Sequence, residues 1–354
     1  SAFIIISMTL CCLLLNSTIT IVESIDINKT VRNQCSTDIV IANGNTFNNV
    51  KGYTQHTDKL DENIIGFIKE QFPTKDEGVI YKNTLDDRNI TIDYGVQCNS
   101  SDIIEENGKR VLLSDRGYIP LGFDDYPISN VYGCNENVFQ RCDFFKIADD
   151  LSVTELYKKL EEGNYVVEAV RRNQGEDSIA ATDFQCKIGD KIQIHRDGNV
   201  ERELEVIAQM SVISTEYEVP NVTTGVANVG GDAPLFYISE NVFKEIYENP
   251  SLMSFSFNVD ENELLSTTEQ IETLVEQSEG KLGCSSIVML KDSMNGLKNT
   301  VYIIGGFISV ILGLAGFINF VNLMITNIIN RKREYAIMQS IGMTTKQLIS
   351  MIVN

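Results

Sequence analysis

Residues 301–329, VYIIGGFISVILGLAGFINFVNLMITNII, form a run of 29 residues that contains no charged residue and no proline. A helix needs about 20 apolar residues to cross the hydrocarbon core of a bilayer. This run is longer, so it can cross with a tilt and still extend beyond the membrane. We therefore predict a transmembrane helix over residues 299–330. The other segments of the chain are interpreted by their position before or after this helix.

Small and polar side chains follow this predicted helix at steps of three or four residues. Small residues on one face let a second helix approach closely in a membrane, and amides that faced lipid would be costly. We expect these residues to pack against other helices: Gly305, Ser309, Gly313, Gly316, Asn319 and Asn322. The alternative is a lone anchor helix in which the glycines have no packing role.

A second apolar run, residues 1–22, ends at Glu23, its first charge. It has no basic region before it and no clear cleavage site, so we favour a first transmembrane helix over a signal peptide. The chain does not begin with Met and is apolar at both ends, so we expect it to be a piece of a longer protein. Basic residues beside a span stay in the cytoplasm, so Arg331–Arg333 place residues 23–298 outside the cell.

The amino-acid composition limits which partners and which kinds of chemical site can be expected. The 354 residues carry a formal net charge of −20, although the segment from Asn330 onward is basic. A large acidic region repels phosphates, so we expect no nucleic-acid partner. The eight cysteines and two histidines show no metal-ligand spacing, and motifs for phosphate binding or hydrolysis are absent. We expect no catalytic, cofactor or metal site; a disulfide between Cys134 and Cys142 stays open.

The region 23–298 is predicted to be an α+β domain of two subdomains, flanked by the two transmembrane helices. Residues 191–208 alternate on both sides of Asp197-Gly198, as in a hairpin. Residues 253–259 alternate as a half-buried strand, and His195 is expected on a strand surface. Two helices are predicted from the capping boxes Ser152-x-x-Glu155 and Ser266-x-x-Glu269, and a third covers residues 61–72.

The stretch after the second span, residues 330–348, reads NRKREYAIMQSIGMTTKQL. Its apolar residues recur at helical spacing, and Gly342 suits a left-handed residue that ends a helix. Thr344 then suits an N-cap, with Gln347 three residues later completing a capping box. These signals predict that the span continues as a basic helix, breaks at Gly342 and restarts as a short helix at the cytoplasmic face.

This stretch resembles the segment that follows the second transmembrane helix in FtsX-like permeases of the MacB type. The resemblance rests on Arg333-Glu334, Ile337, the run Ser340–Thr344 and Gln347-Leu348, whereas Tyr335-Ala336 departs from the common pattern. The layout of the whole chain is similar too. The specific motif covers only about twenty residues.

The resemblance implies a non-catalytic subunit of an ABC transporter with four spans, a MacB-like outer core domain over residues 23–298 and a separate cytoplasmic ATPase. It also implies a homodimer or heterodimer in the cell membrane, typically of Gram-positive bacteria, that serves export of peptides or lipoproteins or resistance to antimicrobials. Residues 331–354 would form the coupling segment. The residues that would contact the ATPase are Arg331, Arg333, Glu334, Gly342, Thr344, Lys346 and Gln347.

A sensor is the alternative from another class: two spans and an outer domain that binds a ligand. A sensor would continue from its second span into a helical linker with heptad repeats. Here the helix is predicted to break at Gly342, and the chain turns apolar again within about ten residues. We therefore favour the permease.

Overall fold

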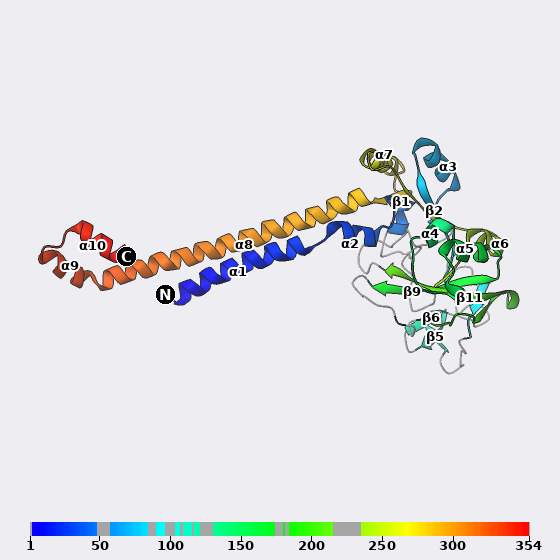
Figure 1. Cartoon of the computed structure of the whole chain (residues 1–354), viewed down its shortest axis with the longest axis horizontal. Coiled ribbons are helices and arrows are strands. Elements are labelled where there is room, and N and C mark those ends of the chain that lie inside the picture. The colour runs from blue at the N-terminus through cyan, green and yellow to red at the C-terminus, as the bar shows by residue number, and fades with distance from the viewer. Residues whose placement is uncertain are drawn as a thin grey trace. The chain divides into compact units, whose positions relative to one another are not determined.

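The computed structural model describes residues 2–47, 57–83, 90–95, 103–106, 109–114, 117–120, 130–173, 180, 184–214 and 235–353 (Figure 1). The chain forms two compact units. We call Asn28–Lys291 the sheet unit, and Ser1–Ile27 together with Asp292–Asn354 the helical unit.

The described part of the sheet unit contains one large mixed sheet of 11 strands in the order β14-β1-β13-β2-β7-β12-β9-β11-β10-β3, with β8 paired to β11. Most neighbours are antiparallel, whereas β9 with β11 and β7 with β12 are parallel. The strands are β1 (Ile39–Asn43), β2 (Lys75–Asn83), β3 (Ile90–Asp93), β7 (Asn130–Cys134), β8 (Asp143–Ile147), β9 (Tyr165–Asn173), β10 (Lys191–Arg196), β11 (Asn199–Ser214), β12 (Leu235–Ser239), β13 (Leu252–Asn258) and β14 (Leu282–Ser286). A separate antiparallel sheet holds β4 (Ile103–Glu106), β5 (Lys109–Ser114) and β6 (Gly117–Pro120).

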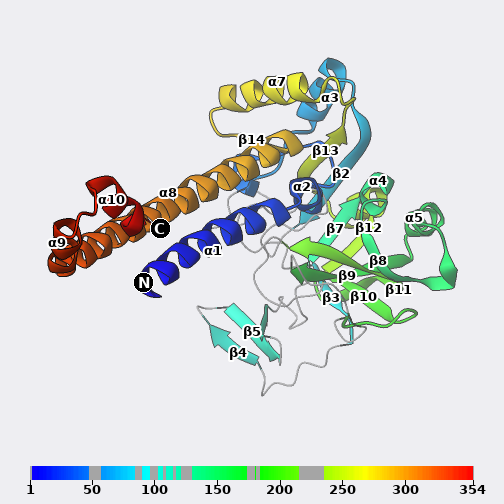
Figure 2. The same cartoon turned by 60° about the vertical axis from the view of Figure 1, so that its left-hand side comes forward.

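Two groups of helices accompany the large sheet. Figures 1 and 2 show α3 and α7 close together near β2 and β14, whereas α4, α5 and α6 lie near β7 and β12. The helices are α2 (Ile27–Gln34), α3 (Glu62–Gln71), α4 (Glu136–Phe139), α5 (Val153–Glu161), α6 (Glu240–Ile246) and α7 (Leu264–Gln277), with 3₁₀ turns η1 (Gly44–Phe47) and η2 (Ala148–Asp150). This is the mixed helix-and-strand domain that the sequence predicts. Since one sheet runs through both groups, the division into two subdomains stays a prediction.

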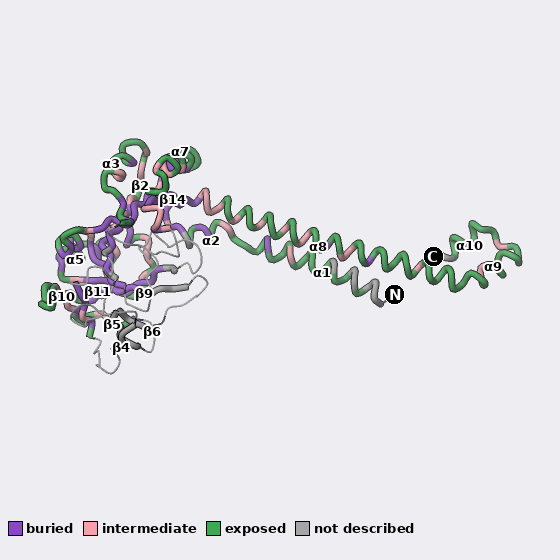
Figure 3. The backbone as a smooth tube through the Cα atoms, turned by 180° about the vertical axis from the view of Figure 1, so that it is seen from behind, coloured by how far each residue is buried: buried purple, intermediate pink, exposed green. Residues whose placement is uncertain are grey.

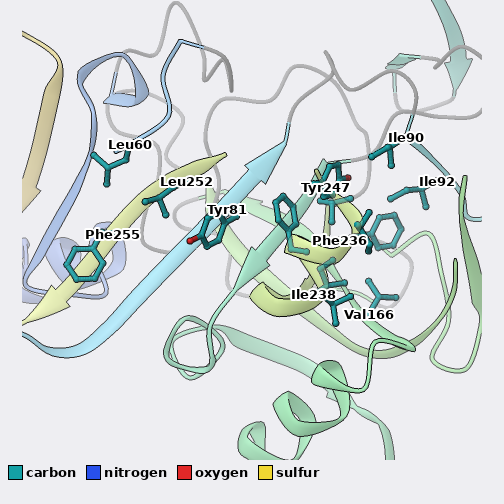
Figure 4. Close-up of a cluster of buried hydrophobic side chains, with 14 of the residues drawn as sticks. Leu60, Tyr81, Ile90, Ile92, Val166, Phe236, Ile238, Tyr247, Leu252 and Phe255 are labelled. Carbon is teal, nitrogen blue, oxygen red and sulfur yellow. The ribbon is translucent and has the colours of Figure 1, made fainter. Parts of the chain in front are cut away.

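The core of the sheet unit is one cluster of buried apolar side chains that joins the strands to their helices. Figure 4 shows part of it, from Leu60 and Phe255 through Tyr81 to Phe236 and Val166. Ile68 of α3 and Ile271 of α7 belong to the same cluster and are almost fully buried. Burial of apolar surface is the main force that holds such a sheet to its helices.

Several local predictions for this unit are confirmed. Ser152 and Glu155 form a complete capping box at the start of α5. The Ser152 hydroxyl and amide bind the Glu155 carboxylate, and these bonds lower the pKa of Glu155. Residues 191–208 form the predicted hairpin of β10 and β11. Asp197 and Gly198 both have positive φ at its turn, as a two-residue hairpin loop requires.

Three local predictions are wrong. Ser266 does not begin its helix, because α7 already starts at Leu264 and the Ser266 hydroxyl donates to the Glu263 carbonyl inside the first turn. The strand β13 is buried on both faces, because every residue from Leu252 to Phe257 is buried. His195 is buried, with 5% of its surface exposed, rather than at a strand surface.

The helical unit consists of α1 (Ala2–Ser24), most of α8 (Ile287–Asn330), α9 (Lys332–Ser340) and α10 (Thr345–Val353). Within the described residues, α8 is the one helix long and apolar enough to cross a membrane, and α1 contributes a shorter apolar stretch, Cys12–Ser24. Figure 3 shows that most residues of α1 and α8 are exposed. The exposed apolar side chains include Ile303 and Phe307, as on a helix that faces lipid. The first span, and the boundaries at residues 23, 299 and 331, stay predictions.

Candidate functional site

One residue of the small-residue stripe on α8, Gly305, packs closely against α1. A Cβ atom added to Gly305 would lie 2.5 Å from Cγ2 of Thr18 on α1, so only glycine fits at this contact. Ser309, one turn further, is buried, and its hydroxyl donates to the Gly305 carbonyl. Gly313 is partly buried and Gly316 is buried. The small side chains therefore lie on the less exposed side of α8, where close helix packing requires them.

The polar residues further along α8 have a different environment. Asn319 and Asn322 are exposed, and the Thr326 hydroxyl donates to the Asn322 carbonyl. Their predicted role in packing against further helices stays a prediction.

At the other end of the helix pair, Glu23 of α1 lies between two residues of α8. The Tyr302 hydroxyl donates to one carboxylate oxygen of Glu23, and Nζ of Lys298 lies 3.9 Å from the other. Glu23 and Lys298 are the residues at which the sequence predicts the spans to meet the aqueous domain. Polar side chains at this level bring the ends of the two helices together in register.

We expect Gly305→Leu to lower the thermal unfolding midpoint of the membrane-embedded protein. The new side chain overlaps Thr18, and close packing supplies most of the association energy between helices in lipid. Gly306→Leu is the matched control, since a Cβ atom there meets no atom within 4 Å. Differential scanning fluorimetry in nanodiscs compares the two variants. Equal midpoints for both would show that the contact between α1 and α8 does not stabilise the protein.

The segment after α8 carries the basic cluster. The structure differs from the sequence prediction in one respect, because the helix already bends at Arg331, whose φ and ψ are −97° and 8°. The hydrogen-bond ladder nevertheless continues, since the Arg331 amide donates to Asn327 and the Tyr335 amide donates to Arg331. Arg331, Lys332, Arg333 and Glu334 are all exposed. The cluster is therefore an accessible basic surface at the junction of α8 and α9.

Gly342 ends α9 in the way that the sequence predicts. Its φ is 104°, a left-handed value that side chains with a Cβ atom rarely adopt. The Met343 amide donates to the Met338 carbonyl and the Gly342 amide donates to Gln339, each at 3.1 Å. These two bonds form a Schellman motif, which satisfies carbonyl groups at the end of the helix.

Thr344 and Gln347 form the predicted capping box at the start of α10. The Gln347 amide donates to the Thr344 hydroxyl at 3.4 Å, and the Gln347 side chain accepts from the Thr344 amide at 3.0 Å. Lys346 is exposed, whereas Leu348 is buried. Stop and start signals two residues apart define the turn between α9 and α10 through local bonds alone.

Two apolar residues of this turn are more exposed than the sequence pattern suggests. The predicted apolar stripe divides: Tyr335 and Met338 are half-buried, whereas Ile337 is 58% exposed and Ile341 is 81% exposed. Isoleucines at such exposure, four residues apart on α9, present an apolar surface beside the basic cluster.

The described residues contain no group of three or more His, Cys, Asp or Glu side chains that could hold a metal ion. Six cysteines are free thiols: Cys12, Cys35, Cys134, Cys142, Cys186 and Cys284. Burial raises the pKa of Cys142 to about 12 and that of Cys35 to about 11, so neither forms a reactive thiolate near neutral pH.

Comparison with known protein families gives a match for the C-terminal part of the chain. Residues 306–353 match the family model "FtsX-like permease C-terminal", which spans most of α8 together with α9 and α10. No curated protein sequence matches the chain.

Two solved structures share features of the fold. The periplasmic region of MacB from Actinobacillus actinomycetemcomitans is 12% identical over 77% of this chain and 98% of its own, with a TM-score of 0.41. The extracellular domain of the noncanonic ABC-type transporter YknZ from Gram-positive bacteria is 11% identical over 64% of this chain and 90% of its own, with a TM-score of 0.33. The family match lies on the segment where the sequence carries its specific motif, so residues 306–353 are similar to the C-terminal part of FtsX-like permeases.

Proposed function

We propose that this chain is the permease subunit through which a separate cytoplasmic ATPase moves an extracellular domain. The observation that carries the proposal is the turn between α9 and α10. It joins a basic surface, two exposed isoleucines and a rigid stop at Gly342 directly to the end of α8. A small, well-defined turn of this kind suits docking on a partner protein, because little conformational freedom is lost on binding.

The proposed orientation follows from charge. Arg331, Lys332 and Arg333 lie directly after the apolar part of α8 and are retained in the cytoplasm, so the acidic sheet unit lies outside the cell. The protein is then a multi-pass protein of the cell membrane, of the Gram-positive type, that works as a homodimer or heterodimer. The exposed amides of α8 pack against further spans of such a multi-pass protein.

The helix α8 is the proposed route of motion. It runs without interruption from Ile287, in the sheet unit, to Asn330, next to the basic cluster. An α-helix is stiff along its axis, so a displacement at its cytoplasmic end reaches its other end. The cargo class that fits this layout is a peptide, a lipoprotein or an antimicrobial compound, exported or expelled with energy from the partner ATPase.

We expect Gly342→Val and Thr344→Ala to uncouple the ATPase while leaving the permease in the membrane. Valine is strained at a φ of 104°, and alanine loses the cap of α10, at a cost of about 1 kcal/mol each. Glu334→Lys reverses the one acidic charge in the basic cluster. The measurements are co-purification of the ATPase subunit with the complete permease and the ATPase activity of the complex. We expect both to fall severalfold.

Two conservative variants serve as controls. Asparagine tolerates the left-handed region, so Gly342→Asn is expected to retain coupling, and Thr344→Ser keeps the capping hydroxyl. The proposal would be contradicted by normal partner binding and activity, at equal expression, in Gly342→Val, Thr344→Ala and Glu334→Lys. Residues 331–348 would then serve only to fix the orientation of the chain in the membrane.

A further inference from the structure

The first and last segments of the sheet unit meet at one residue, Asp38, which directly precedes β1 and is 7% exposed. Its main-chain carbonyl accepts a 3.0 Å hydrogen bond from the amide of Ile287, the first residue of α8. The first amides of a helix have no partner within the helix. The start of α8 is therefore attached to the start of β1 by a bond between residues 249 positions apart in the sequence.

The carboxylate of Asp38 binds two further elements, one with each oxygen. Oδ1 accepts from the Arg32 guanidinium of α2 at 3.0 Å, and Oδ2 accepts from the Val259 amide, just after β13, at 3.1 Å. The Asp38 amide in turn donates to Oδ1 of Asn258 at 3.0 Å. The side chain of Asp38 is only 11% exposed, so these charge-assisted bonds are partly shielded from water and stronger than those of a surface ion pair.

The strand before α8 adds a second attachment at the same place. The Ser286 hydroxyl accepts from the Met289 amide at 3.2 Å and so caps the first turn of α8. Ser286 is almost fully buried and pairs with Ile39 in the register between β14 and β1. The first turn of α8 is thereby held against the residue that follows Asp38, and it has little freedom to rotate about the end of the sheet.

We infer that Asp38 is a positioning residue that holds the first turn of α8 in register with α2 and β13. A displacement of α8 then moves the sheet and does not merely bend the connection between α8 and the sheet. This inference rests on the proposed function for its direction of motion. The role of Asp38 in holding the first turn of α8 rests only on the hydrogen bonds described above. Asparagine cannot replace Asp38, because its amide group would face either Arg32 or the Val259 amide, both of which are donors.

The first test is amide hydrogen exchange on the complete permease in nanodiscs, without nucleotide, read on peptides that contain Val259 or Ile287. In Asp38→Asn we expect exchange at both amides to rise roughly tenfold. The Ile287 amide is the informative one, because its acceptor is the main chain of residue 38, which the substitution leaves in place. Faster exchange at Val259 with an unchanged Ile287 would overturn the inference and leave Asp38 as a local cap.

Two further variants are compared with Asp38→Asn in the same experiment. Arg32→Gln removes only the link to α2, and the Arg32 side chain is 51% exposed, so the fold is retained and an intermediate increase at Ile287 is expected. Glu203→Gln is the matched control, since it removes an exposed ion pair with Lys191 in the hairpin of β10 and β11. We expect no change at Ile287 in the control. An equal rise in all three variants would show general loosening and would also overturn the inference.

The second test adds the ATPase subunit and a non-hydrolysable nucleotide. Asp38→Asn and Arg32→Gln are expected to retain the partner and the ATPase activity but to lose at least half of the nucleotide-dependent change in exchange along β13. A full response in both variants would contradict a positioning role. If the wild-type protein itself neither binds an ATPase nor responds to nucleotide, the proposed function fails, while the exchange of Ile287 in the first test still decides the role of Asp38.

Discussion

Gly133→Val is expected to prevent stable folding of the sheet unit, with a loss of about 4 kcal/mol or more in the free energy of unfolding. Gly133 lies in β7, between β2 and β12 in the middle of the sheet, and helix α6 crosses it. A Cβ atom added there would lie 2.3 Å from Cβ and 2.4 Å from Cγ of Phe243. These atoms are next to the backbone of α6, so a rotamer change of the ring cannot relieve the overlap and the helix itself must move.

The cost is large because the site has no free space. Phe243 is fully buried and packs against Tyr247 in a tilted arrangement, with ring centroids 4.4 Å apart. A shift of α6 would therefore separate side chains that pack at the density of a protein interior. The free energy of unfolding of a domain is only about 5–15 kcal/mol in total, so this one substitution removes a large part of it.

Urea denaturation of residues 28–291, expressed alone, measures the effect. Gly66→Ala is the matched control, since Gly66 is exposed in α3 with no atom near its added Cβ. Alanine there is expected to stabilise by roughly 0.5–1 kcal/mol. Phe243→Ala keeps the Cβ atom and is not expected to rescue Gly133→Ala. Rescue by that second change would show that the ring, and not the path of the α6 backbone, excludes a side chain at residue 133.

The second large effect is expected at Glu168, a fully buried acid in β9. Its two carboxylate oxygens accept from the main-chain amides of Gln185, at 2.7 Å, and Cys186, at 3.1 Å. Gln209 of β11 donates to the Cys186 carbonyl at 2.8 Å. Glu168→Ala removes the acceptors for two main-chain amides, of which that of Cys186 is buried, so we expect a loss of about 3 kcal/mol in the free energy of unfolding.

Burial raises the pKa of Glu168, and this effect outweighs the hydrogen bonds from Gln185, Cys186 and Gln209, which lower it; the nearby Asp190 raises it further. The folded state therefore holds a proton on Glu168 at pH values where the unfolded chain, with an ordinary pKa of 4.5, has released it. Over that window the folded state binds more protons, so the contribution of Glu168 to stability falls as the pH rises. The fall begins near the ordinary pKa and ends above the raised one.

Glu168→Gln isolates this titration, because glutamine has the same size and does not ionise. The difference in unfolding free energy between wild type and Glu168→Gln is expected to decrease from pH 4.5 upward and then to level off. Glu203→Ala, at an exposed position of β11, is the control and is expected to have a small effect at every pH. A difference that grows with rising pH would mean that the amide donors, and not burial, control the charge of Glu168.

The sequence alone determined those features whose physics lies within a few neighbouring residues. The apolar run of α8 indicated a transmembrane helix, because the thickness of a bilayer fixes the length that such a run needs. The stop at Gly342, the capping boxes at Ser152 and Thr344 and the turn at Asp197-Gly198 were predictable for the same reason. Each uses bonds between residues at most five positions apart.

Features that depend on the order of strands could be decided only by the tertiary structure. The alternation of β13 indicates a strand with one wet face, but both of its faces are buried in the folded domain. His195 lies on the opposite face of β10 from Ile192 and Ile194 and is buried as well, which the pattern of β10 does not indicate. The false helix start at Ser266 has a related cause, because a preceding turn at Asp260–Glu263 already begins the helix.

The residues with the largest expected roles belong to this second class. Asp38 and Ile287 meet because β1 and β14 are neighbours at the edge of the sheet, and Gly133 meets Phe243 because α6 follows β12 across β7. An aspartate before a strand, or a glycine within one, has many possible environments in a sequence. The non-local pairing of strands selects one of them, because the energy of a buried polar bond or of a steric overlap depends on which atoms the completed sheet brings into contact.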